Sequence, residues 1–136
     1  MTKDEALFSF FNSFGIPGYP STAVPTYEDL VADGIIQAGE SQYPYLTYTP
    51  VFDAWGGYPV SLTVNLWYLT EDEAPPSAKA QEISNAIGPG GITLPCEGGY
   101  IWLNRGSPWC QSLTDNINAN IKRRYLNVTA DFLTLN

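Results

Sequence analysis

Regular alternation of apolar and polar residues over Val60–Tyr68 constrains the fold more than any other feature of this sequence. The apolar set is Val60, Leu62, Val64, Leu66 and Tyr68, and the set between them is Ser61, Thr63, Asn65 and Trp67. Successive side chains of a strand point to opposite faces, so this period of two predicts a strand with one buried face. A second alternation predicts a final strand from about Arg123 to Leu133, with Leu126, Val128, Ala130 and Phe132 on its buried side.

Two segments have the signals of helices. Thr2 followed by Glu5 forms a capping box, and apolar residues then recur every three or four positions as far as Phe14. In the second segment, Ser77 is the expected N-cap, and Gly88 with Pro89 ends the helix. Strands with two helices predict an α+β fold: a mostly antiparallel or mixed β-sheet with both helices packed on one face.

We expect the 136 residues to form a single compact domain. Its predicted parts are a helix at about 3–14, a proline-rich crossing at 15–42, a hairpin at 43–69, a helix at 77–87 and strands within 91–135. Among the last strands, short ones are expected to be separated at Gly98-Gly99 and at Gly106-Ser107-Pro108. The crossing is expected to be extended rather than a strand, because each proline removes an amide donor. A short helix is predicted within it, at Tyr27–Ala32.

Charge and missing residue types exclude several functions. The formal charge of −8 argues against nucleic-acid binding as the main role, because phosphate is repelled over most of the surface. There is no histidine, so the usual general base and the commonest metal ligand are both absent. We therefore predict no catalytic site, no metal and no cofactor. Cys96 and Cys110 could form a disulfide if they lie on neighbouring strands, but we expect free buried thiols, because the chain begins without a signal-peptide pattern and is expected to be made in the cytoplasm.

Three of the six positive charges are adjacent, at Lys122, Arg123 and Arg124. They could contact phosphates, or they could neutralise acidic groups in their own chain or in a neighbouring subunit. Alternation along the final strand places Arg123 and Arg124 on opposite faces, which argues against one continuous basic patch. Ion pairing is the favoured interpretation, because the arginine fork binds carboxylates in a bidentate manner.

The turn of the predicted hairpin, "DAWGGYP", carries two large aromatic residues, Trp55 and Tyr58. Aromatic side chains at a loop tip suggest contact with a partner. The candidate interface residues are therefore Trp55, Tyr58, Lys122, Arg123 and Arg124.

Three stretches together resemble the tail terminator, or tail completion, proteins of long-tailed bacteriophages and prophages: "FNSFGIPGYPSTAVP", "PYLTYTPVFDAWGGYPVSLTVNLWY" and "IKRRYLNVTADFLTL". The resemblance spans nearly the whole chain. The segment from Tyr27 to Gln42 is longer than the family pattern leads us to expect.

The resemblance implies a non-enzymatic virion protein at the head-proximal end of the tail. Such proteins form a ring, usually a homohexamer, that stops growth of the tail tube and provides the surface for head joining. The implied partners are other copies of the chain, the tail-tube protein and a head-completion or stopper protein. Genomic DNA passes through the lumen as cargo, and no membrane is involved.

Other functions remain open. One is a different head–tail connector or tail-tube morphogenesis protein. Another is an extracellular carbohydrate-binding β domain, in which Trp55, Trp102 and Trp109 would stack on sugars. A third is an acid-catalysed hydrolase that uses two carboxylates such as Asp53 and Glu97.

Overall fold

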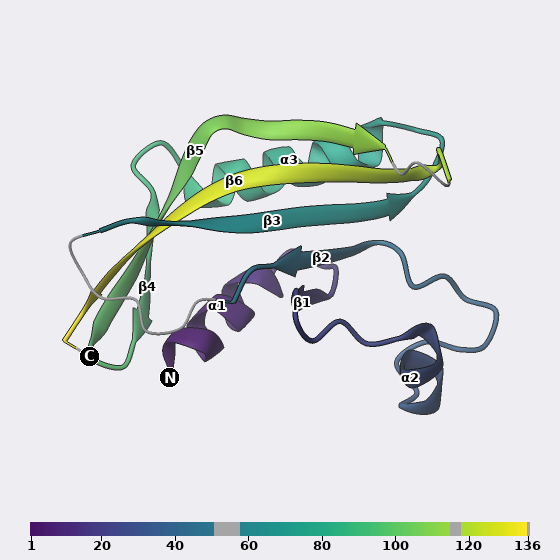
Figure 1. The fold of residues 1–136 in the computed structure, drawn as a ribbon, viewed down its shortest axis with the longest axis horizontal. Helices are drawn as coiled ribbons and strands as arrows, with labels where there is room; N and C mark the ends of the chain where they lie inside the picture. The colour runs from purple at the N-terminus through teal and green to yellow at the C-terminus, as the bar shows by residue number, and fades with distance from the viewer. Residues whose placement is uncertain (51–57, 115–117, 136) are drawn as a thin grey trace.

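The computed structural model describes residues 1–50, 58–114 and 118–135 (Figure 1). In chain order the elements are α1 (Lys3–Phe11), β1 (Gly18–Pro20), α2 (Tyr27–Ala32), β2 (Tyr45–Tyr48), β3 (Val60–Leu69), α3 (Ala74–Ile87), β4 (Ile92–Cys96), β5 (Gly99–Thr114) and β6 (Ile121–Thr134). Six strands form one sheet in the order β1-β2-β3-β6-β5-β4. Among the described strands, only β1 and β2 pair in parallel, and every other neighbouring pair is antiparallel. The predicted α+β class is confirmed.

Both long alternations form the central pair of strands. Leu62 pairs with Val128 and Val64 with Leu126, so the two predicted apolar sets lie side by side on one face of the sheet. These four side chains have no exposed surface. Their burial follows from the period of two, because a strand with one apolar set must turn that set away from water.

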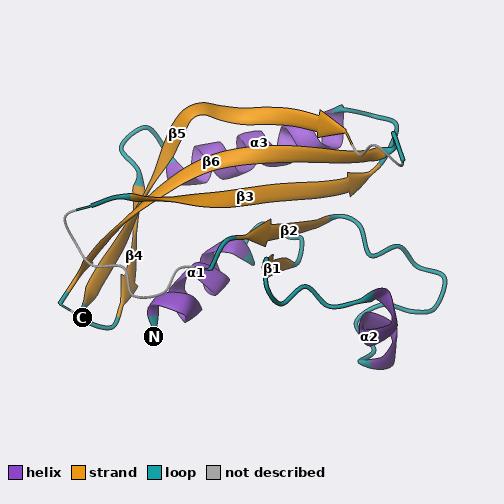
Figure 2. Ribbon diagram, viewed as in Figure 1, coloured by secondary structure: helices purple, strands orange, loops and turns teal. Residues whose placement is uncertain are grey.

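The helices α1 and α3 cover this same face, as predicted. Phe11 of α1 stacks on Tyr48 of β2, with ring centroids 4.8 Å apart. On α3, the buried hydroxyl of Ser84 accepts a hydrogen bond from Arg105 of β5. Figure 2 shows α3 lying along β5 and β6, whereas α2 stands apart from both other helices. We call the side of the sheet that bears α1 and α3 the helix-covered face, and the other side the open face.

The start of α1 agrees with its sequence signals, whereas its end differs. Thr2 and Glu5 form both hydrogen bonds of the capping box. The helix ends at Phe11 instead of near Phe14, because Asn12 binds both the backbone N–H and the carbonyl of Gly18 through its side-chain amide. These bonds turn the chain into β1, and Phe14 stays buried after the helix has ended.

The proline-rich crossing contains a strand, β1, although its prolines led us to expect an extended segment outside the sheet. β1 pairs with β2 over three residues, Gly18–Pro20, and it is the edge of the sheet. Proline is tolerated at an edge because a strand there uses only one side of its backbone for pairing. The predicted short helix at Tyr27–Ala32 is confirmed as α2.

The second predicted helix begins earlier than expected. α3 starts at Ala74, so Ser77 lies inside the helix and the N-cap is Glu73. Pro75 and Pro76 fit in the first turn because the backbone N–H groups there have no partner within the helix. The predicted end at Gly88 is confirmed.

The two short strands expected around Gly106–Pro108 form one long strand, β5. Its pairing with β6 shifts between Arg105, opposite Val128, and Cys110, opposite Leu126. The extra residues on β5 bulge out while the strand continues on the same neighbour. Glycine and proline therefore mark an irregularity here rather than a strand end.

Two further observations concern the cysteines and hydropathy. Cys96 on β4 and Cys110 on β5 are free thiols, as predicted, but both are half-buried rather than buried. Within the described residues, no helix combines the length and the apolar character that a membrane span would require.

Candidate interaction surface

The basic run at the start of β6 is divided between the two faces of the sheet. Arg124 pairs with Leu66, and it therefore lies on the helix-covered face. Arg123 pairs with Trp67 and lies on the open face. This confirms the prediction that alternation prevents one continuous basic patch.

Arg124 is the centre of a hydrogen-bonded network inside the chain. Only 5% of the residue is exposed. Its guanidinium donates to a carboxylate oxygen of Glu73, to Ser77 Oγ at 3.0 Å and to Ser112 Oγ at 2.8 Å. The network joins the start of α3 to β5 and β6. The predicted ion pairing of the basic run is confirmed at this residue.

Lys122 also interacts with Glu73, less closely. Its ammonium lies 3.9 Å from a carboxylate oxygen of Glu73 and donates to the carbonyl of Ala119 at 2.5 Å. Its side chain is 13% exposed. Lys122 and Arg124 were predicted to be interface residues, and the structure gives both of them contacts within the chain. Arg123 is the member of the run that faces outward on the open face.

The predicted hairpin turn carries the aromatic residues Trp55 and Tyr58. Tyr58 is 81% exposed, the most exposed tyrosine in the described part of the chain. Trp55 lies outside the described residues. The predicted interface role of this turn stays a prediction.

A row of aromatic side chains runs across one end of the open face. We define this aromatic row as Tyr19, Tyr43, Tyr45, Trp67 and Arg123, which extend from β1 to β6. The indole of Trp67 stacks on Tyr45 with centroids 6.1 Å apart, and Arg123 lies over the Trp67 ring at 5.5 Å. Tyr45 contacts Tyr19 and Tyr43 at 6.2 and 5.4 Å. Trp67 Nε1 donates to Thr47 Oγ1 at 3.0 Å, which fixes the ring on the sheet.

The side chains of the aromatic row are half-buried, and this burial raises the pKa of two of its tyrosines. Burial is the main cause that raises the pKa of Tyr45 to about 12, and Tyr43 and Tyr19 add to the effect. Burial also raises the pKa of Tyr19. Near neutral pH these phenols are therefore uncharged and can donate hydrogen bonds. With Arg123, the row therefore offers hydrogen-bond donors and one positive charge on an aromatic surface.

The sequence contained a signal for this row. Trp67 belongs to the polar set of β3, among Ser61, Thr63 and Asn65. A large aromatic residue in the outward phase of an amphipathic strand points to contacts on the open face. Its neighbours Tyr19 and Tyr45 could not be assigned to it, because the pairing of β1, β2 and β3 is a long-range property.

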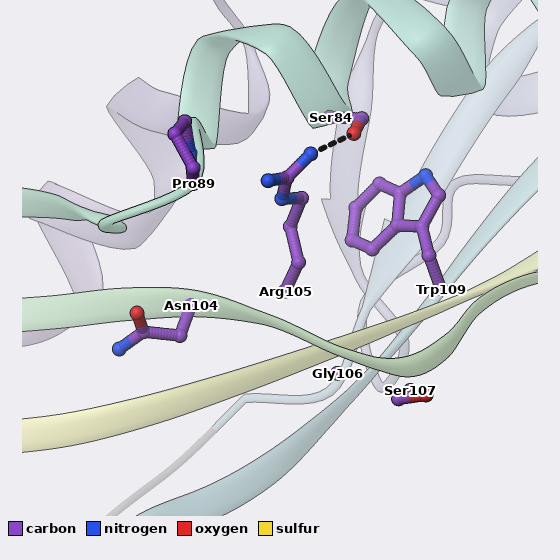
Figure 3. A pocket seen from close by; sticks show the side chains of 7 residues that line it. All are labelled: Ser84, Pro89, Asn104, Arg105, Gly106, Ser107 and Trp109. Carbon is purple, nitrogen blue, oxygen red and sulfur yellow. Dashed lines mark hydrogen bonds between the residues drawn. The ribbon is translucent and has the colours of Figure 1, made fainter.

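A pocket of about 360 Å³ lies at the irregularity in β5 (Figure 3). Arg105 stands between Pro89 and the ring of Trp109, and it donates to Ser84 Oγ at 2.8 Å. The lining residues include no carboxylate, histidine or cysteine. The lining therefore offers a positive charge and hydroxyl groups, without the acid–base pair that hydrolysis would need.

The structure gives little support to the carbohydrate-binding and acid-catalysed hydrolase alternatives. Trp102 is on the open face, opposite Asp131, whereas Trp109 packs against the core beside α3. These two tryptophans therefore do not form one sugar-binding platform. Glu97 is exposed, and Asp53 lies outside the described residues. Across the part of the chain that the structure describes, no three acidic or cysteine side chains gather as a metal site would require.

Comparisons with protein-family models, with curated proteins and with solved structures find no match to this chain.

Proposed function

We propose that this chain is a structural subunit of a long-tailed bacteriophage, a tail terminator that closes into a ring at the head-proximal end of the tail tube. The ring stops tube growth and offers the surface to which the head is joined. The observation that supports this best is the open face of the sheet. It carries no helix among the described residues, yet it holds an ordered row of aromatic side chains with Arg123 at its end.

A ring places particular demands on its subunits. A head-to-tail contact that closes by rotation joins two different surfaces of each copy. An aromatic row with one arginine has the composition of an interface core, where aromatic residues and arginine are enriched. The chain also carries a charge of −8, so a lumen lined by such subunits would let DNA pass without binding it tightly.

The main alternative is a neighbouring part of the same assembly, either a tail-tube protein or another head–tail connector. The open face serves these roles equally well. The position on the particle distinguishes them, because a terminator sits only at one end of the tube, whereas a tube protein extends it.

The first experiment is to measure the native mass of the purified chain over a range of concentrations, with and without Mg²⁺. We expect a discrete hexameric ring. The protein is then mixed with tail tubes assembled from the tube protein of the same genome, and electron microscopy locates the bound density. Density at one end only, with tubes that no longer elongate, supports a terminator.

Other outcomes contradict the proposal. Tubes that grow longer by incorporating the chain would identify a tube protein. A chain that stays monomeric and leaves tube ends bare and growing would exclude the terminator role.

A further inference from the structure

The segment at residues 21–42, which we call the acidic arm, is a second distinctive surface. Its charged residues are all acidic: Glu28, Asp29, Asp33 and Glu40. All four are exposed. The arm contains no lysine or arginine, so its charge is not balanced from within.

The acidic arm has its own ordered structure. Thr26 caps α2 by accepting a hydrogen bond from the N–H of Asp29 at 3.2 Å. The hydroxyl of Tyr27 accepts from the N–H of Gly39 at 2.8 Å, which ties the two ends of the arm together. Leu30 is 4% exposed. A preformed segment loses less conformational entropy on binding than a disordered one.

The arm extends away from its own sheet. Figure 1 shows α2 apart from α1, from α3 and from the strands, and no described helix or strand packs extensively against it. None of the ion pairs between described residues involves an arm carboxylate. Ile35 is 61% exposed on the same segment. The arm therefore exposes hydrogen-bond acceptors, negative charge and an apolar side chain on the surface of the chain.

Arg123 and the tyrosines of the aromatic row have the complementary character. Within the described residues, the guanidinium of Arg123 has an aromatic contact with Trp67 and no carboxylate partner. An ionised carboxylate only accepts hydrogen bonds, whereas the arginine fork and a neutral phenol donate them. The arm carboxylates are therefore opposite in charge to Arg123, and they can accept the hydrogen bonds that Arg123 and the tyrosines can donate.

We propose that the acidic arm of one copy docks on the aromatic row of the next copy, with its carboxylates on Arg123 and on the tyrosine hydroxyls. This rests on the proposed ring and names the contact that closes it. The arm and the row are two different surfaces of each copy, and a heterologous contact joins two different surfaces.

Charge exchange tests the contact. The first variant is Arg123→Glu, and the second combines Glu28→Lys with Asp33→Lys on the arm. The arm variant keeps Thr26 and the N–H of Asp29, so the cap of α2 remains. A third variant carries all three substitutions. The matched control is Arg105→Glu, on the helix-covered face, which reverses an exposed arginine that also has no carboxylate partner among the described residues.

We expect the row variant and the arm variant each to raise the ring dissociation constant about tenfold or more, the size typical of one lost charge-assisted contact. The triple variant should recover most of the lost affinity, because the glutamate introduced in the row then faces the lysines introduced in the arm. The Arg105→Glu control should assemble like the parent chain. Analytical ultracentrifugation gives the constants, and urea unfolding midpoints verify that each variant is folded.

Two results would overturn the inference while leaving the terminator role intact. One is a parent chain that caps tail tubes, with row and arm variants that assemble as well as the control. The other is a triple variant whose losses add without recovery. A parent chain that neither assembles nor caps tubes would exclude the ring itself, and the arm contact with it.

Discussion

Replacing Arg124 by alanine should destabilise the chain substantially, although the residue's main ion-pair partner is half in solvent. The Arg124 side chain is 6% exposed, whereas that of Glu73 is 55% exposed. The substitution removes two methylenes from the buried stem, which costs about 1.6 kcal/mol at roughly 0.8 kcal/mol each. Without Arg124, Glu73 and the exposed serines Ser77 and Ser112 regain water.

The polar contacts add a smaller amount to this cost. A hydrogen bond to a neutral partner contributes about 0.5–1.5 kcal/mol, and an ion pair with an exposed partner contributes about 1 kcal/mol or less. Allowing for rehydration of the two serines, we expect Arg124→Ala to lower the free energy of unfolding by about 3 kcal/mol. For a chain of this size that corresponds to a fall in Tm of about 10 °C.

The matched control is Glu73→Gln, which removes the negative charge and leaves an acceptor for Arg124. Its expected cost is about 0.5 kcal/mol, because solvent screens the half-exposed pair. Urea unfolding followed by tryptophan fluorescence measures both variants, with an unchanged dependence on urea as the check for two-state behaviour. A loss below about 1 kcal/mol for Arg124→Ala would refute the stem-burial argument. Equal losses in the two variants would show that the ion pair dominates.

Three further predictions test the core, the sheet and the aromatic row. The pKa of Tyr45 is raised to about 12 in the folded chain, so its contribution to the free energy of unfolding is complete below about pH 10 and falls as the pH rises toward 12. Over that range, the free energy of unfolding should depend less on pH in Tyr45→Phe than in the parent chain. Phe11→Ala should cost about 3–5 kcal/mol in urea unfolding, and Phe8→Ala much less, because Phe11 is fully buried and Phe8 is 48% exposed. Gly99→Ala should lower Tm clearly, since a Cβ there would overlap a backbone carbonyl of β6, whereas Gly90→Ala meets no atom within 4 Å and should have little effect.

Local patterns predicted much of the fold because they report local physics. The capping box at Thr2, the helix end at Gly88 and the alternation in β3 and β6 all depend on residues close in the chain. Two of the errors occurred where contacts outside the local helix or strand pattern took over. Asn12 ended α1 early by binding Gly18, and β6 kept β5 in one piece across its proline and glycine residues.

The candidate surface was only partly visible in the sequence. Alternation alone separated Arg123 from Arg124, and both directions are confirmed. It did not reveal that Arg124 binds Glu73, 51 positions away. The aromatic row was missed, apart from the signal of Trp67, because its members come from different strands.

By itself, the sequence determined which side chains must leave water, where α1 and α2 begin and how little positive charge the chain carries. These are consequences of composition and of periods of two and about 3.6 residues, which need no knowledge of neighbours. The tertiary structure alone decided that β6 lies between β3 and β5. It also decided that Tyr19, Tyr45 and Trp67 meet. Strand order and facing surfaces arise from long-range packing, because many pairings satisfy the same local pattern and only the assembled core selects one.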